Sequence, residues 1–300
     1  MKLNDIISTV IVNENYKILI DCDFQTFGLV ESTVDKTICT FVDDEKYIPM
    51  LSNNTTMIIT TKELSRYIKN KGICIVENPR LFFFDVHNKL KNNAMYIRDK
   101  FKSTVGINSN ISELSYIADN NVIIGNNVII EEFVSIKENS IIGDNSIIRA
   151  GTIIGGIDFE FKRLNNGEML SVEHYGGVII GKNVEIQHNC SICKALYPWD
   201  NTIVGDNTKI DDLVQISHGV KIGNGVMIVG QSGIGGRTII GDNTWIGYGS
   251  TIKNGIKVGE NCRVNMGAVV TKNVDNFDSV SGNFAINHDK FISFIKSISK

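Results

Sequence analysis

The sequence predicts a coil of stacked parallel β-strands, preceded by a small α/β domain and followed by a short helix. Three observations support this fold class. Aliphatic residues recur at every sixth position over most of residues 124–270, strand and helix signals without that period occupy residues 1–105, and His288–Ile298 is amphipathic. A period of six fits neither a helix (3.6) nor a lone strand (2.0), so it indicates short strands joined by corners.

The period is held in two registers. At six-residue steps from Ile180 to Val270, every position is Ile or Val except Pro198. A second register runs from Ile124 to Ile154 and contains only isoleucines. The residue two positions earlier is mostly small or β-branched, and we expect it to pack at a corner. Each coil of such a repeat buries its inward residues only against its neighbours, so stability grows with the number of coils.

The two registers are separated by a break across Gly155–Gly177. We expect this stretch to leave the coil as an inserted loop over residues 156–177, because insertions in repeat proteins lie on one face, often the binding face. The expected organisation is therefore an α/β domain at 1–105, a coil at 106–274 and a helical tail at 275–300.

The first 105 residues alternate strand and helix signals, which favours a small α/β domain. Thr60–Glu63 is a capping box that predicts a helix to about Asn70. Asn78 and Pro79 are typical of the N-cap and first position of a helix, which we expect to reach about Leu90. Four β-rich runs are expected to be strands: Asn15–Asp21, Lys36–Val42, Thr56–Thr60 and Gly72–Val76.

Composition limits the function classes. With 42% hydrophobic residues, 21% charged residues and a net charge of −3, the chain is typical of a soluble globular protein. It lacks the clustered basic surface of a nucleic-acid-binding protein and any apolar run long enough for a membrane span. The cytoplasm is therefore the expected compartment, and four scattered cysteines, Cys22, Cys39, Cys74 and Cys262, agree with it, since thiols stay reduced there. The spacing of Cys190 and Cys193 is that of a redox motif, but Cys190 falls on the repeat, so we expect a structural role.

Two segments of the coil resemble a known family. Lys209–Gly223, which contains Ile-Ser-His218, and Gly177–Ile186 are similar to the UDP-3-O-(3-hydroxyacyl)glucosamine N-acyltransferases of lipid A synthesis. These belong to the hexapeptide-repeat acyltransferases, so the resemblance implies a left-handed parallel β-helix and a homotrimer. It also implies that His218 is the general base and that Gly236 presents a backbone N–H to the oxyanion.

The N-terminal domain resembles the uridine-binding domain of the same family, through Cys39–Pro49 and Glu77–Pro79. The resemblance implies that Phe41 and Tyr47 pack on the pyrimidine ring and that Asp44 reads its edge. The family usually has Asn at this last position. An ionised Asp can accept a hydrogen bond but cannot donate one, so uridine and thymidine nucleotides both remain open.

Histidine suits the expected chemistry, because its ordinary pKa near 6.5 lets it take a proton from an attacking amine at neutral pH. His174, just before the insertion rejoins the coil, and Gln215, in the same segment as His218, are further expected substrate contacts. The other histidines, His87, His188 and His288, are expected at the surface.

The resemblance implies an N-acyltransferase that moves a 3-hydroxyacyl or short acyl group to the amino group of a nucleotide-linked amino sugar, for surface glycan or lipid A synthesis. Acyl-CoA or acyl carrier protein would be the donor, with no further cofactor. Two departures leave the sugar, chain length and donor open. Gly255 stands where the family has a second histidine, and Cys193–Ala195 replaces its Asp-Arg-Gly.

Three alternatives compete with this reading. A non-catalytic coil would explain the repeat but not the nucleotide-like domain, and a sugar O-acetyltransferase would use the same fold. A zinc-dependent carbonic anhydrase needs a closely spaced histidine pair, which His174, His188 and His218 do not provide. We therefore expect no metal. Met227 is expected to point outward from the coil, which favours a surface covered by another subunit.

Overall fold

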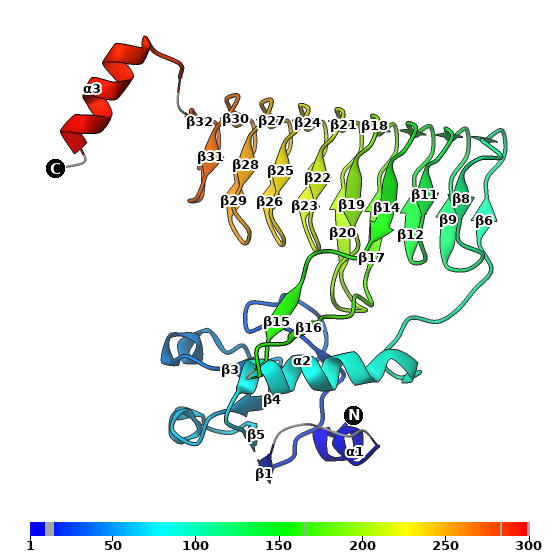
Figure 1. The fold of residues 1–300 in the computed structure, drawn as a ribbon. Coiled ribbons are helices and arrows are strands. Elements are labelled where there is room, and N and C mark those ends of the chain that lie inside the picture. Colours follow the sequence, from blue (N-terminus) through cyan, green and yellow to red (C-terminus); the bar gives the residue numbers. More distant parts are fainter. Residues whose placement is uncertain (10–14, 165, 283, 299–300) are drawn as a thin grey trace.

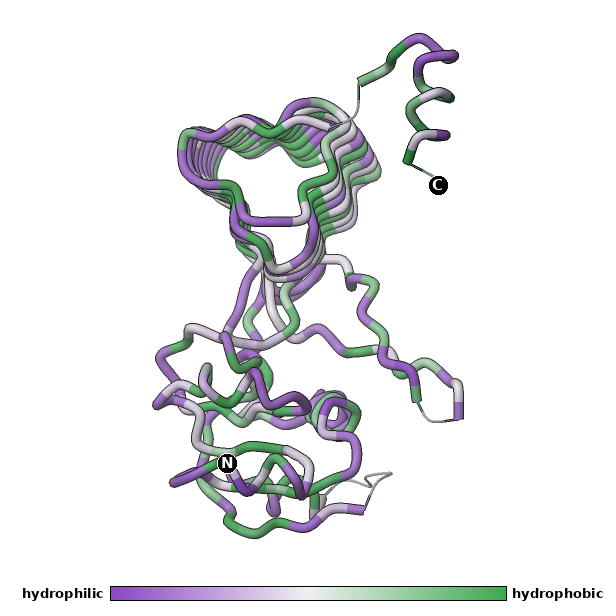
Figure 2. The backbone as a smooth tube through the Cα atoms, turned by 90° about the vertical axis from the view of Figure 1, so that its left-hand side faces the viewer, coloured by the Kyte–Doolittle hydropathy of each residue, from purple (hydrophilic) through white to green (hydrophobic). Residues whose placement is uncertain are grey.

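The computed structural model describes residues 1–9, 15–164, 166–282 and 284–298. It has three parts along the chain: an α/β part, a long three-sided coil and a C-terminal helix that stands apart from the coil (Figure 1). The coil is seen end-on in Figure 2, where successive turns superimpose on one another. The expected parallel β-helix is confirmed.

The N-terminal part contains a five-stranded sheet in the order β1-β5-β4-β3-β2, parallel except for the pairing of β1 with β5. All four expected strands are present, and Asn78 caps α2 by accepting from the Leu81 N–H, as expected. Neither α1 nor β2 was expected. The elements are α1 (Leu3–Thr9), β1 (Lys17–Ile20), β2 (Thr26–Phe27), β3 (Ile38–Val42), β4 (Thr55–Thr60), β5 (Gly72–Ile75) and α2 (Pro79–Lys89), with 3-10 turns at Glu45–Met50, Leu64–Tyr67 and Leu90–Asn92.

The helix expected from Thr60 to about Asn70 is wrong, because this segment forms only the 3-10 turn Leu64–Tyr67. Thr61 does cap the turn, accepting from the Leu64 N–H at 3.3 Å. The chain then becomes extended at Ile68, which is buried in a small cluster under the sheet. Burying this residue ends the helical turn, so tertiary packing overrides the local capping signal.

The coil consists of three parallel sheets, and each full turn adds one strand to each sheet. The first sheet contains β7 (Asn110–Ile111), β10 (Ile129–Ile130), β13 (Ile147–Ile148), β18 (Glu185–Ile186), β21 (Lys209–Ile210), β24 (Met227–Ile228), β27 (Trp245–Ile246), β30 (Arg263–Val264) and β32 (Ser279–Val280). The second contains β8 (Tyr116–Ile117), β11 (Ser135–Ile136), β14 (Ile153–Gly156), β19 (Ser191–Cys193), β22 (Gln215–Ile216), β25 (Gly233–Ile234), β28 (Thr251–Ile252) and β31 (Val269–Val270). The third contains β6 (Thr104–Val105), β9 (Val122–Ile124), β12 (Ser140–Ile142), β17 (Gly177–Ile180), β20 (Asn201–Val204), β23 (Lys221–Ile222), β26 (Ile239–Ile240) and β29 (Lys257–Val258).

The aliphatic repeat forms the core of the coil. Every Ile and Val of both registers is buried and belongs to one continuous cluster that runs inside the three sheets. Cys190 lies in this cluster, and Cys193 is buried beside it; neither forms a disulfide. The expected position of Cys190 on the repeat is therefore confirmed. A core of this length makes the coil a rigid support for side chains on its outer faces.

Two segments leave the coil and contact the N-terminal part. The first, between β14 and β17, was expected as a loop but contains a hairpin of β15 (Phe161–Arg163) and β16 (Met169–Ser171). Asn88 at the end of α2 donates from Nδ2 to the Ser171 carbonyl at 2.7 Å. The second segment joins β19 to β20, and its Trp199 donates from Nε1 to the Phe27 carbonyl at 2.8 Å. These contacts fix the N-terminal sheet beside the coil.

His87 is not at the surface as expected but fully buried at this junction. Its Nε2 lies 2.9 Å from the Glu173 carbonyl, which can only accept, so Nε2 carries the proton. Nδ1 then accepts from the Tyr96 hydroxyl at 2.8 Å. Burial lowers the pKa of His87 to about 4, so the neutral ring links α2 to the inserted segment at neutral pH.

The C-terminal helix α3 (His288–Ile298) has the bounds that its amphipathic pattern predicted, and none of its residues is buried. Among the described residues, no helix combines the length and the apolar composition that crossing a membrane requires.

Candidate active site

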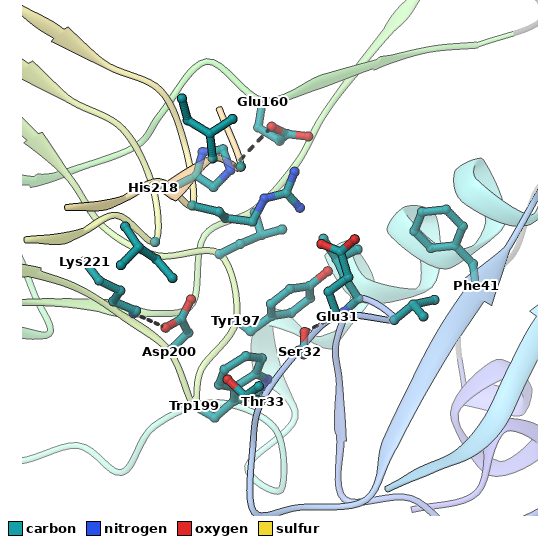
Figure 3. A pocket seen from close by; sticks show the side chains of 18 of the residues that line it. Glu31, Ser32, Thr33, Phe41, Glu160, Tyr197, Trp199, Asp200, His218 and Lys221 are labelled. Carbon is teal, nitrogen blue, oxygen red and sulfur yellow. Dashed lines mark hydrogen bonds and ion pairs between the residues drawn. The ribbon is translucent and has the colours of Figure 1, made fainter. Parts of the chain in front are cut away.

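A pocket of about 500 Å³ lies between the N-terminal part and the coil. Residues from three regions line the pocket: the N-terminal sheet and its loops, the two segments that leave the coil, and the outer face of the coil (Figure 3). Three of the expected site residues, Phe41, Tyr47 and His218, line this one pocket although they are far apart in the sequence.

His218 follows β22 on the coil and is held by Asp158 of the inserted segment. The carboxylate oxygen Oδ2 accepts from the His218 backbone N–H at 2.8 Å and lies 2.6 Å from Nδ1 of the ring. The side chain of His218 is only 11% exposed. We expected it on the open outer surface of the coil, but the inserted segment covers it and leaves access from the pocket.

Asp158 is an anion in this position. Burial alone would raise the pKa of its carboxyl, but hydrogen bonds from the ring and backbone of His218 and from the Phe159 N–H outweigh burial and hold that pKa well below its ordinary range. An ionised carboxylate accepts only, so Nδ1 of His218 is the protonated nitrogen. Nε2 of the neutral ring therefore carries the lone pair that can take a proton.

Gly236 lies directly against the ring of His218, one coil further on. A Cβ atom at this position would come 2.7 Å from Cε1 and 2.8 Å from Nε2 of His218, so only glycine leaves room for the imidazole. Within the described residues, the N–H of Gly236 has no hydrogen-bond acceptor. A free backbone N–H beside a base is the arrangement that an oxyanion needs.

His174 lies beside His218, with ring centroids 5.8 Å apart and the rings nearly perpendicular. Its Nδ1 is 2.9 Å from the Val172 carbonyl and therefore donates, which leaves Nε2 as an acceptor. Nε2 is buried and has no partner in the described part of the chain. Burial, followed by electrostatic interaction with the nearby His218, lowers the pKa of His174 to about 4, so the His174 ring is neutral.

Phe41 and Tyr47 form the part of the pocket furthest along the N-terminal sheet. The Phe41 ring packs against Phe83 with centroids 5.1 Å apart, and the Arg80 guanidinium lies 5.5 Å from its centre. The Lys46 ammonium lies 4.9 Å from the Tyr47 ring. Both rings are half-buried and line the pocket, so each is available to an aromatic ligand.

Three expected substrate contacts, His174, Asp44 and Gln215, are not among the residues that line the pocket. Asp44 is exposed and caps the 3-10 turn Glu45–Met50, accepting from the Lys46 N–H at 3.0 Å and pairing with its ammonium at 2.7 Å. The hydrogen bonds and charge of Lys46 lower the pKa of this carboxyl. Gln215 is exposed on the outer face of β22, where its Nε2 donates to Ser217 Oγ at 2.8 Å.

Five cationic side chains and the carboxylates of Glu31, Glu160 and Asp200 line the pocket, so it carries a small excess of positive charge. Lys162 pairs with Glu160, Lys221 pairs with Asp200, and Arg80 pairs with Asp43. Two further cations line the pocket, Arg237 and Lys257, and neither forms an ion pair with any described residue. Such a pocket favours ligands that carry negative charge.

Several site residues were not expected from the sequence, namely Asp158, Glu160, Tyr197 and Arg237. The only available signal for Asp158 and Glu160 was the break in the repeat, which marked the insertion as a whole. Among the described residues, no group of three or more His, Cys, Asp or Glu side chains is arranged to hold a metal ion.

The six-residue repeat matches known protein families. Residues 121–156 and 201–236 match the family described as bacterial transferase hexapeptide (six repeats), and residues 237–272 match the family described as hexapeptide repeat of succinyl-transferase. These matches fall on turns of the coil on both sides of the insertion.

Two relatives are UDP-3-O-acylglucosamine N-acyltransferases from Helicobacter pylori, strains HPAG1 and J99. Each is 36% identical in an alignment 220 positions long that covers 66% of this chain. The match spans 64% of the length of these relatives.

Solved structures share the fold. A UDP-N-acetylglucosamine acyltransferase from Campylobacter jejuni superimposes with a TM-score of 0.53 at 23% identity, over 65% of this chain and 79% of that one. The corresponding enzyme from Bacteroides fragilis 9343 also gives 0.53, at 26% identity over 67% of this chain and 75% of that one.

Proposed function

We propose that the protein transfers an acyl group to the amino group of a nucleotide-linked amino sugar. The premise is that the chain belongs to the hexapeptide-repeat acyltransferases and resembles the UDP-3-O-acylglucosamine N-acyltransferases. The donor is an acyl thioester of CoA or of acyl carrier protein, and the product serves lipid A or surface glycan synthesis. The observation that carries the proposal is the pairing of His218 with Asp158 over Gly236, in the same pocket as Phe41.

The reaction needs a base, a site for the oxyanion and a place for the leaving group. Nε2 of His218 takes a proton from the attacking amine as the new N–C bond forms. The free N–H of Gly236 stabilises the tetrahedral oxyanion. When the C–S bond breaks, the protonated ring returns the proton to the departing thiolate, so that the histidine ends the cycle neutral. Asp158 holds the ring in the tautomer that this sequence of steps requires.

The N-terminal part supplies the nucleotide site in this proposal. Residues 1–105 bind the base between Phe41 and Tyr47, and the coil at 106–274 carries the transfer chemistry. His174 contacts the sugar through its unpartnered Nε2. Asp44 and Gln215 reach substrate only if the ligand or a neighbouring subunit extends beyond the pocket of a single chain.

The finer partners are also part of the proposal. The active assembly is a homotrimer in the cytoplasm, where the six free cysteines remain reduced. The glycine at position 255 makes a short-chain acyl-CoA donor as compatible with this chain as a long-chain carrier-protein donor.

The decisive experiment combines a donor panel with a single substitution. Purified protein is assayed with acyl-CoA and acyl-carrier-protein donors on UDP- and dTDP-linked amino sugars. His218→Asn should lower kcat about 10²- to 10⁴-fold with little change in KM, because an amide cannot take the proton. His188→Asn is the matched control, because His188 is exposed and pairs with Asp212 away from the pocket.

The outcomes separate the alternatives. An amide product from any donor supports the proposal, whereas an ester on a sugar hydroxyl would favour a sugar O-acetyltransferase. No turnover with any donor would favour a non-catalytic coil. If His218→Asn keeps most of the wild-type kcat, the base is a different group.

A further inference from the structure

Tyr197 presents an unusual buried hydroxyl. It lies in the segment between β19 and β20, with its ring stacked on Trp199 at 5.7 Å and 2° between planes. The Tyr197 ring also makes edge-to-face contacts with the rings of Phe83 and His87. The residue is only 4% exposed, and its hydroxyl oxygen has no hydrogen-bond partner among the described residues. Buried polar atoms in native proteins are nearly always hydrogen-bonded, so this one requires an explanation.

A purely structural explanation is unfavourable. The ring makes all its contacts through carbon atoms, which phenylalanine would make equally well. An unpartnered buried hydroxyl destabilises the folded state, because it loses its hydrogen bonds to water without replacing them. The hydroxyl at Tyr197 is therefore explained best by a partner that arrives from outside the chain.

The position of Tyr197 indicates which part of a ligand that partner is. The ring lines the pocket, and Figure 3 shows it between His218 on the coil and Phe41 on the N-terminal sheet. Phe83 contacts both Tyr197 and Phe41. At the other end, the Arg237 backbone N–H donates to the His218 carbonyl at 2.8 Å. A nucleotide sugar would extend from its pyrimidine ring at Phe41 and Tyr47 to its amino group at His218. The diphosphate is the middle part of such a ligand.

The charges near Tyr197 agree with this assignment. Three charged groups act on Tyr197, namely Arg237, Glu160 and Asp200. Both carboxylates are paired with lysines, whereas Arg237 has no ion pair among the described residues. Arg237 takes a left-handed φ of 59° at a corner where the preceding and following coils have Gly219 and Gly255. Burial raises the pKa of the Tyr197 hydroxyl far above its ordinary value, so the group remains protonated and can donate. A protonated hydroxyl beside an unpaired guanidinium is suited to a phosphoryl oxygen.

We propose that Tyr197 is a further substrate-binding residue, whose hydroxyl donates a hydrogen bond to a phosphoryl oxygen of the nucleotide sugar beside Arg237. The inference rests on the proposed function, since it takes the nucleotide site at Phe41 and the base at His218 as its two ends.

The test is Tyr197→Phe, with binding of uridine, UDP, thymidine and dTDP measured by titration calorimetry. The affinity for the diphosphate should fall about 10- to 100-fold, as expected for a hydrogen bond to a charged group, while nucleoside affinity stays the same. The Tm should be unchanged or higher, because the lost hydroxyl has no partner in the free protein. Tyr96→Phe is the matched control, because the buried Tyr96 hydroxyl bonds to His87 at 2.8 Å. It should lower the Tm and leave diphosphate affinity unchanged.

The outcomes distinguish the inference from the proposed function. If wild-type protein binds neither UDP nor dTDP, the proposed nucleotide site at Phe41 and Tyr47 is wrong, and the inference about Tyr197 is wrong as well. If wild-type protein binds but Tyr197→Phe binds equally well, the inference alone is overturned. Equal weakening of nucleoside and diphosphate would also overturn it, because the hydroxyl would then act on the base or ribose.

Discussion

At the scale of single residues, one hydrogen bond decides which nitrogen of His218 can act as a base. The Asp158 carboxylate accepts from the backbone N–H of His218, which fixes its position, and from Nδ1 of the ring, so the ring cannot rotate without losing the second bond. The sequence identified His218 and Gly236 through a local segment. It could not identify Asp158, which lies 60 residues earlier and reaches the ring only because the insertion folds back over the coil.

Asp158→Asn should lower kcat about 100-fold or more, because the amide can present an N–H to Nδ1 and favour the wrong tautomer. KM for the acceptor and the Tm should change little if the carboxylate only positions the ring. The chain offers a matched control in Asp212, which lies 2.9 Å from Nδ1 of the exposed His188. Asp212→Asn should keep wild-type kcat. Equal losses in both variants would show that the effect of Asp158 is structural.

At the scale of elements, the six-residue period predicted the coil because each strand repeats the same inward residue. Helix α2 was predictable because its cap is local, with Asn78 accepting from Leu81. The hairpin of β15 and β16 was not predictable, since the insertion has no repeat of its own and its position depends on contacts with α2. The burial of His87 was missed for the same reason, because its partner Glu173 is 86 residues away.

The junction between α2 and the insertion should be sensitive to acid. Unfolded histidine takes up a proton near pH 6.5, whereas burial lowers the pKa of folded His87 to about 4. Between these values the unfolded chain binds more protons, so stability falls as the pH drops from about 6.5 to 4. His174, with a pKa also near 4, contributes in the same direction.

The measurement is the Tm across this pH range for wild type and for His87→Gln. The glutamine can still donate to the Glu173 carbonyl but does not titrate. Its Tm should therefore fall less than that of wild type on acidification, by an amount equivalent to about 3 kcal/mol of unfolding free energy at most. A residual slope from His174 is expected. Identical pH dependence in the two proteins would contradict the assignment to His87.

At the scale of the whole molecule, the pocket exists because two segments leave the coil and hold the N-terminal sheet beside it. The six-residue period predicts the coil, and the alternation of strand and helix signals predicts the N-terminal sheet. Neither pattern predicts the contacts between the coil and the sheet. Resemblance supplied Phe41, Tyr47 and His218 separately, and the structure brings them into one cavity. Asp44 and Gln215, expected by the same reasoning, remain outside it on exposed surfaces.

The exposed side of the coil leads to the last prediction, a homotrimer. Met227 points outward on β24 with 42% of its surface exposed, and other large apolar side chains are exposed on the outer faces of the coil. They are Tyr248, Met266 and Val269. Large apolar side chains exposed on the outer faces of a rigid coil favour burial against another subunit. Light scattering at micromolar concentration should therefore give three times the chain mass of 33.3 kDa.

Met227→Lys tests where that trimer forms. A charge placed in an apolar interface costs several kcal/mol when it has no partner, so the variant should dissociate at concentrations where wild type stays assembled. Tyr67→Lys is the control, because Tyr67 is also an exposed large side chain but lies on the N-terminal part. A monomer mass for the wild type would contradict assembly altogether. If the Met227→Lys variant remains a trimer, the interface lies on another face of the coil. The site at which a second chain could bring residues such as Gln215 toward the substrate would then lie on that face as well.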